Sequence, residues 1–181
     1  MMNKRIEFSL VLIVMLIFTT SQAAVISVPA GYASIQDAID AAQDGDVIEV
    51  QSGIYYENVD VYKPLTLRGV GMPTVDAGRK SSAITLSADG VTLEGFNATN
   101  YSDAGIEIIS DCNIIKGNSA YGNDDGIDDG IFLDKSCNNT IEGNNMSRSY
   151  HGIRIHESNN NIIKGNKVNY NIAFEGGISR I

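Results

Sequence analysis

Short alternations of apolar and polar residues run through the chain and predict β-strands. In residues 152–156, Gly-Ile-Arg-Ile-His, the two isoleucines would point to one side of a strand, and Arg154 and His156 to the other. Ile84 and Leu86 flank Thr85 in the same way. These stretches are too short for helices, and their period of two favours strands with one buried face.

A repeated motif organises these strands. Residues 113–118, Asn-Ile-Ile-Lys-Gly-Asn, recur with small changes at 139–144 and 161–166, and in degenerate form at 66–69 and 92–95. The glycines of this motif are spaced by 26, 22, 26 and 22 residues, and a second Gly-Ile motif begins at Gly105, Gly130, Gly152 and Gly177. Such periods are typical of solenoids. The sequence therefore predicts an all-β fold, a right-handed parallel β-helix over residues 47–181.

Stacking these repeats would place equivalent residues above one another, about 4.8 Å apart. The residue before each motif glycine would then form a column that alternates in charge at every step: Arg68, Glu94, Lys116, Glu142 and Lys164. The asparagines at the two ends of the motif would form ladders, whose amides satisfy the backbone of the turns.

Residues 24–46 are expected to cap the N-terminal end of the solenoid. Ser34 to Asp37 resembles a capping box, and Ile35, Ala38, Ile39 and Ala42 share one face of a helix that we expect to end at Gly45. No such cap is visible near Ile181, so the C-terminal end is expected to be truncated.

The first 23 residues have the pattern of a signal peptide. Lys4 and Arg5 precede an apolar stretch of about eleven residues, and small residues precede a cleavage site after Ala23. Cleavage would leave 11 basic and 21 acidic residues of the original 13 and 22, a net charge of −10. Nucleic acid is not expected as a partner of so acidic a chain, nor is membrane insertion once the signal is removed.

Part of the chain resembles known families. Residues 34–42, 45–50, 53–58 and 65–71 resemble the N-terminal segment of pectin methylesterases and of NosD-like β-helix proteins, and the later repeats resemble the NosD and carbohydrate-binding/sugar-hydrolase family. Over residues 28–181 the resemblance implies a pectate-lyase-like solenoid of the kind common on cell surfaces. The catalytic Gln-Asp and Asp-Phe motifs of pectin methylesterases are absent from the middle repeats. NosD proteins are implicated in maturing copper centres, but two His, two Cys and no His or Met cluster are a poor ligand set for copper.

The clearest irregularity is the acidic segment 123–130, in which an Asp-Asp-Gly-Ile unit is doubled. Its carboxylates, Asp124, Asp125, Asp128 and Asp129, would lie in a turn before the strand at Ile131. One interpretation is a solvated acidic bulge, and the other is a calcium site, since Ca²⁺ prefers such oxygen ligands. The segment also resembles the Asn-Thr-Asp-Gly motif of polygalacturonases, which makes Asp128, Asp129 and Arg154 the candidate catalytic residues, although glycosidases place their acids on neighbouring repeats.

A second set of candidates follows from stacking. Asp103, Asp128, Tyr150 and Glu175 would form one column, and Glu107, Phe132, Arg154 and Ser179 another. An aromatic ring, acids and Arg154 along one face could bind an extended glycan; the alternative is an ordinary mixed surface. His151 and His156 are interpreted as surface or turn residues rather than ligands. Cys112 and Cys137 lie one repeat apart and are either a disulfide or two stacked thiols. Asn97, Asn100, Asn138 and Asn145 begin Asn-x-Ser/Thr sequons.

These features predict a secreted, periplasmic or cell-surface β-helix module without catalytic activity, which binds polysaccharide or other envelope components, or has a structural role there. The first alternative is a fragment of a lyase, epimerase or hydrolase that acts on polysaccharide, and the second is a NosD-like protein linked to copper-site maturation. Calcium is the only cofactor that the residues themselves suggest.

Overall fold

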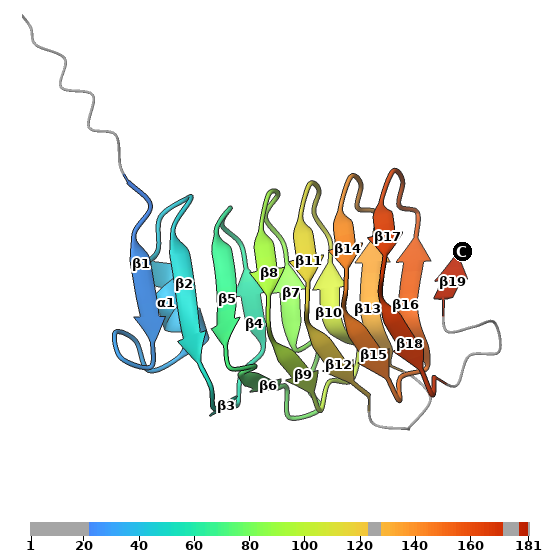
Figure 1. The fold of residues 1–181 in the computed structure, drawn as a ribbon, viewed down its shortest axis with the longest axis horizontal. Helices are drawn as coiled ribbons and strands as arrows, with labels where there is room; N and C mark the ends of the chain where they lie inside the picture. The colour runs from blue at the N-terminus through green and yellow to red at the C-terminus, as the bar shows by residue number, and fades with distance from the viewer. Residues whose placement is uncertain (1–21, 123–127, 172–177, 181) are drawn as a thin grey trace, which may run out of the picture.

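The strands of the chain stack into a parallel β-solenoid, seen from the side in the computed structural model of Figure 1. The structure describes residues 22–122 and 128–171, and the backbone of 178–180. Sheet A contains β1 (Val25–Val28), β2 (Val47–Gln51), β5 (Thr66–Val70), β8 (Thr92–Glu94), β11 (Ile114–Lys116), β14 (Thr140–Glu142) and β17 (Ile162–Lys164).

Two further sheets complete each turn. Sheet B contains β3 (Ile54–Tyr55), β6 (Thr74–Asp76), β9 (Asn97–Thr99), β12 (Ser119–Tyr121), β15 (Asn145–Ser147) and β18 (Lys167–Asn169). Sheet C contains β4 (Val59–Val61), β7 (Ile84–Leu86), β10 (Ala104–Ile108), β13 (Asp129–Asp134), β16 (His151–His156) and β19 (Ile178–Arg180). Every pairing is parallel, which confirms the predicted fold class.

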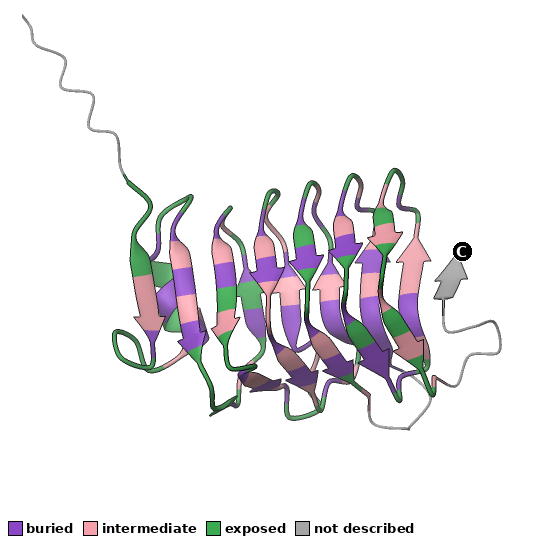
Figure 2. Cartoon of the chain, in the orientation of Figure 1, coloured by how far each residue is buried: buried purple, intermediate pink, exposed green. Residues whose placement is uncertain are grey.

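The core consists of stacked aliphatic side chains. Ile48, Leu67, Leu93, Ile115 and Ile141 follow one another in register along sheet A, and all are fully buried. The residues that alternate with them along each strand are less buried, as the alternating colours of the strands in Figure 2 show. Each fully buried Leu or Ile side chain contributes about 1.5–3 kcal/mol. The apolar columns of the three sheets meet in one continuous hydrophobic core that runs along the solenoid.

The asparagine ladders predicted from the repeat are present. The side-chain Oδ1 of Asn139 accepts a hydrogen bond from the backbone N–H of Asn113 at 2.8 Å, and Asn161 does the same for Asn139. The second ladder follows the same rule, with Asn144 bonded to the backbone of Asn118. Since these amides are buried, they satisfy backbone donors at the corners that no sheet pairing reaches.

The alternating charge column is also confirmed. Glu94 lies between Arg68 and Lys116, with its Oε2 2.8 Å from the Lys116 Nζ, and Lys164 is 3.2 Å from Glu142. Hydrogen bonds from Lys116 and then Arg68 hold the pKa of Glu94 below its ordinary value. Exposed pairs of this kind are each worth only about 0.2–1 kcal/mol, so the column fixes the register more than it stabilises the fold.

The predicted capping helix is α1 (Ile35–Ala41), which contacts β1, β2 and β4 at the N-terminal end of the solenoid. The Ser34 Oγ accepts a hydrogen bond from the Asp37 backbone N–H at 3.0 Å, as expected for the capping box. The predicted end at Gly45 was wrong, because the backbone leaves the helix at Ala42. The Lys63 ammonium donates hydrogen bonds to carbonyl groups at this end of the helix, which have no partner within the helix itself.

Strand β1 was not predicted. It lies in the segment assigned to the cap, pairs with β2, and begins sheet A before the helix is reached. Three of its four residues, Val25, Ile26 and Val28, are apolar and β-branched, so the local pattern did carry a strand signal, although the segment was assigned to the cap.

Candidate functional site

The predicted column of Glu107, Phe132 and Arg154 lies on the outer face of sheet C. Register pairs place Phe132 directly between Glu107 on β10 and Arg154 on β16. All three side chains are partly exposed. The backbone of Ser179 pairs with Arg154 in β19, and its side chain lies outside the described residues.

The column of Asp103, Asp128 and Tyr150 is in register as well, but its three members differ in exposure. Asp103 and Tyr150 are exposed, whereas Asp128 is fully buried. Its Oδ1 accepts a hydrogen bond from the Tyr150 backbone N–H at 3.2 Å, so this carboxylate supports the next turn of the chain. Asp128 is therefore part of neither a solvated bulge nor an exposed ligand-binding column, contrary to both predictions. Glu175 lies outside the described residues.

Asp129 is the centre of the most compact group of charged side chains on sheet C. It begins β13 rather than standing in the preceding turn, and only 5% of its surface is exposed, so the prediction of a solvated carboxylate was wrong here too. The Asp129 Oδ1 lies 2.7 Å from the Nδ1 of His151, and its Oδ2 lies 3.4 Å from an Nη of Arg154. The two partners come from β16, so the next turn of the solenoid provides both.

The electrostatics of Asp129 follow from this arrangement. Burial removes water from the carboxylate and raises its pKa, while His151 and Arg154 act in the opposite direction without cancelling the effect. A carboxylate with a raised pKa that contacts an imidazole can exchange a proton with it, which is the elementary step of acid–base chemistry.

Aromatic rings extend the Asp129 group along the face. The guanidinium of Arg154 lies over the ring of Phe132, 4.8 Å from its centre. The Tyr150 ring meets the His151 ring edge-on at 4.5 Å. Arg154 has a side chain 33% exposed, and its Nε is buried with no hydrogen-bond partner within the described part of the chain. We refer to Asp129, Phe132, Tyr150, His151 and Arg154 as the sheet C cluster.

Sequence reasoning found four members of the sheet C cluster and missed His151, which it interpreted as a surface or turn residue. The signal was available, because the spacing of the Gly-Ile motifs at 130 and 152 puts Asp129 directly below His151. Glu107 is not part of the cluster: its carboxylate accepts a hydrogen bond from the Ser82 hydroxyl at 2.9 Å. A second pair, His156 and Asp134, lies at the other end of the same two strands, with 2.7 Å between Nδ1 and Oδ1.

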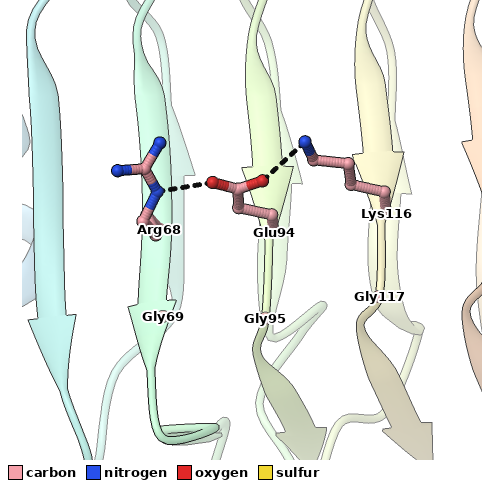
Figure 3. A pocket seen from close by; sticks show the side chains of 6 residues that line it. All are labelled: Arg68, Gly69, Glu94, Gly95, Lys116 and Gly117. Carbon is pink, nitrogen blue, oxygen red and sulfur yellow. Dashed lines mark hydrogen bonds and ion pairs between the residues drawn. The ribbon is translucent and has the colours of Figure 1, made fainter.

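A separate hollow of about 420 Å³ lies on sheet A, where the sequence predicted only a charge column (Figure 3). Arg68, Glu94 and Lys116 form one side of it, and Gly69, Gly95 and Gly117 leave the other side without side chains. Because the three charged groups bond to one another, this hollow offers few free polar groups to a ligand.

The remaining candidates are located as follows. Asp124 and Asp125 lie outside the described residues, and within them no group of three or more His, Cys, Asp or Glu side chains could hold a metal ion. Calcium binding by the acidic segment therefore stays a prediction. Cys112 and Cys137 are both free thiols, and the Cys112 backbone N–H donates a hydrogen bond to the Cys137 carbonyl at 3.1 Å. No helix of the described ranges, 22–122 and 128–171, is long and apolar enough to cross a membrane.

The three stacked parallel sheets define a β-solenoid protein. A family model described as a right-handed beta helix region matches residues 46–179, and the chain belongs to this family. It is 31% identical over 160 residues to a cell surface glycoprotein of Methanothermus fervidus and 30% identical over 149 residues to the probable ABC transporter binding protein NosD of Pseudomonas aeruginosa. These matches cover 81% and 74% of this chain but 26% and 34% of the relatives, so the chain spans about a quarter to a third of their length.

Solved structures of pectin methylesterases are also similar. One, in complex with a hexasaccharide, matches 81% of this chain and 67% of its own, with a TM-score of 0.46 and 15% identity. Another, from Aspergillus niger, matches 90% and 82%, with a TM-score of 0.39 and 13% identity. The predicted resemblance to NosD-like β-helix proteins is confirmed.

Proposed function

We propose that this chain is a β-helix module of the cell surface or envelope that binds polysaccharide through the sheet C cluster. The observation that carries this proposal is the arrangement of Phe132 on β13 beside His151 and Arg154 on β16, with Tyr150 directly before β16. The relationship to a cell surface glycoprotein supports the location.

The chemistry of the cluster suits a sugar chain. A sugar ring has an apolar face, which packs on an aromatic ring, and a rim of hydroxyl groups, which bond to charged and polar side chains. Tyr150 has 39% of its surface exposed, and its ring contacts the edge of the His151 ring, which favours one orientation. Arg154 is held by Asp129 and Phe132 and keeps part of its guanidinium at the surface. Ordered side chains lose less entropy on binding, which favours affinity.

The register of the solenoid adds an extended site. Glu107, Phe132 and Arg154 repeat along the axis at the spacing of parallel strands, about 4.8 Å, which is close to the length of one sugar unit. A glycan that lies along the axis would therefore meet a new side chain at nearly every unit.

The test is affinity gel electrophoresis of the full chain against neutral, uronic-acid and amino-sugar polysaccharides. We expect retardation by at least one polysaccharide, and a loss of about tenfold in affinity for Tyr150→Ala and Arg154→Ala. Tyr56→Ala and Arg68→Ala are the matched controls, because both side chains are exposed and neither residue belongs to a strand of sheet C. The proposal is wrong if no polysaccharide retards the wild type, or if all four variants behave alike.

A polysaccharide-active enzyme is the second candidate, and one observation favours it. The 2.7 Å contact between Asp129 and His151 joins a carboxylate of raised pKa to an imidazole whose side chain is 14% exposed. Release of reducing or unsaturated ends from a bound polysaccharide, lost in Asp129→Asn and His151→Ala, would establish this candidate. Retained binding without product would support the binding module.

A further inference from the structure

Four asparagines begin Asn-x-Ser/Thr sequons, and they differ in local structure and in the hydrogen bonds of their side-chain amides. An N-glycan acceptor needs an accessible amide nitrogen, and such sequons are used in surface turns of exported proteins. Asn100 and Asn138 lie in turns, whereas Asn97 and Asn145 are the first residues of β9 and β15.

Two of the four amides are already engaged. The Asn100 Nδ2 donates a hydrogen bond to the Asp76 carboxylate at 2.8 Å, and the Asn97 Nδ2 donates one to the Met72 carbonyl at 3.2 Å. Both bonds link the asparagine to the preceding turn of the solenoid. Glycosylation would have to break them, and the bond to a charged carboxylate is the stronger kind.

The amides of Asn138 and Asn145 are exposed and have no hydrogen-bond partner among the described residues. They differ in the hydroxyl two positions later. Ser147, which completes the Asn145 sequon, is buried, whereas Thr140, which completes the Asn138 sequon, is partly exposed on β14. Asn138 alone combines a turn, a free amide and an accessible hydroxyl.

We propose that Asn138 is an N-glycan acceptor of this chain. The donor is an oligosaccharide linked to a polyprenyl diphosphate. The Asn138 Nδ2 attacks the anomeric carbon, the C–N bond forms, and the bond from that carbon to the diphosphate oxygen breaks. The polyprenyl diphosphate leaves with the electron pair, and the amide gives up one proton, so no oxidant is needed. In the cell this modification depends on the exported location proposed above.

The backbone at Asn138 has its own reason for asparagine. Its φ is +59°, and the equivalent residues of neighbouring turns, Gly90, Cys112 and Asn160, also have positive φ. Asparagine adopts this region more readily than most residues. Asn160 therefore meets the backbone requirement without a sequon, since Ile162 stands two positions later. It is the natural control for a purely structural role.

The experiment uses the full chain made in a bacterial cytosol that lacks N-glycosylation. The folded protein is incubated with an oligosaccharyltransferase that accepts Asn-x-Ser/Thr, together with its lipid-linked oligosaccharide, and occupancy is measured by mass spectrometry. Peptides 94–104 and 134–149 report how well each sequon is used without the fold. In the peptides, we expect similar occupancy of all four sequons. In the folded chain, we expect the occupancy of Asn138 to be about tenfold or more higher than that of Asn97 and Asn100.

The variants separate recognition from folding. Thr140→Val keeps the shape of the side chain and should abolish modification, Thr140→Ser should retain it, and Asn160→Gly should leave it unchanged. The proposal is overturned if Asn138 is modified in its peptide but not in the folded chain. It is also overturned if Asn100 and Asn138 are equally occupied in the folded chain. A chain modified in this assay but retained in the cytoplasm of its own cells would overturn the envelope location and leave the acceptor assignment intact.

Discussion

Removing the side chain of Asn144 is expected to destabilise the solenoid far more than removing that of its neighbour Asn145. Asn144 is 1% exposed, and its amide makes four hydrogen bonds. Its Oδ1 accepts from the backbone and side-chain nitrogens of Asn118 at 2.9 and 3.1 Å. Its Nδ2 donates to the Ile115 carbonyl at 2.9 Å and to the Asn166 Oδ1 at 3.0 Å. Asn145 is exposed, and its amide makes none with the described residues.

The magnitude follows from what Asn144→Ala leaves behind. The Asn118 backbone N–H would be buried without a partner, which costs about 1–3 kcal/mol, and each of the other lost bonds costs about 0.5–1.5 kcal/mol. The expected loss in free energy of unfolding is therefore about 2.5–7.5 kcal/mol. Asn145→Ala, the same chemical change one residue later, should stay within about 0.5 kcal/mol.

Urea unfolding followed by far-UV circular dichroism measures both losses, and hydrogen exchange at Asn118 shows whether the damage is local, since solenoids can unfold turn by turn. Ordinary surface substitutions change the free energy of unfolding by about 0.5 kcal/mol. If Asn144→Ala and Asn145→Ala lower it by amounts that differ by less than about 1 kcal/mol, the prediction is wrong. It would mean that water replaces the ladder amides without cost.

Two further predictions concern a glycine and a carboxylate. A Cβ on Gly69 would lie 2.2 Å from the Gly95 carbonyl oxygen, so Gly69→Ala should lower the free energy of unfolding by about 3 kcal/mol or more. Gly143 has φ +64° but open space around it, so Gly143→Ala should lower it by about 1–2 kcal/mol. Equal losses in urea unfolding would contradict the close approach at Gly69. Burial raises the pKa of Asp129 above its ordinary 3.8, so its contribution to stability is present at low pH and is lost as pH rises through the raised pKa. Asp129→Asn should therefore gain stability relative to the wild type as pH rises above about 3.8, and a stability difference that stays flat or changes with the opposite sign in urea unfolding at several pH values would contradict this prediction.

Most of the fold could be predicted from the sequence because a solenoid repeats its constraints. The spacing of the motif glycines placed Arg68, Glu94 and Lys116 in one column, and the structure has that register. The ladder asparagines were predictable for the same reason. The end of α1 was not, because Lys63, distant in sequence, completes its last turn.

The candidate site was less predictable, because burial at a corner is not set by alternation. Asp103 and Asp128 occupy equivalent positions, and only Asp128 is buried. The carboxylate of Asp128 accepts a hydrogen bond from the Tyr150 N–H of the next turn. A pattern read along one strand does not contain that contact.

The irregularity of the repeat also explains why the cluster exists at this turn. Where Asp129 begins β13, the equivalent residue of the preceding turn is Ala104, which has no group to hold a side chain of the strand above. The doubled Asp-Asp-Gly-Ile unit supplies a carboxylate at that position, and the following turn supplies His151 and Arg154 opposite it. Burial disfavours the charged form of Asp129, and its pKa is raised for this reason. The arrangement provides an ordered imidazole and guanidinium beside Tyr150 and Phe132, the groups through which we propose that the chain binds polysaccharide.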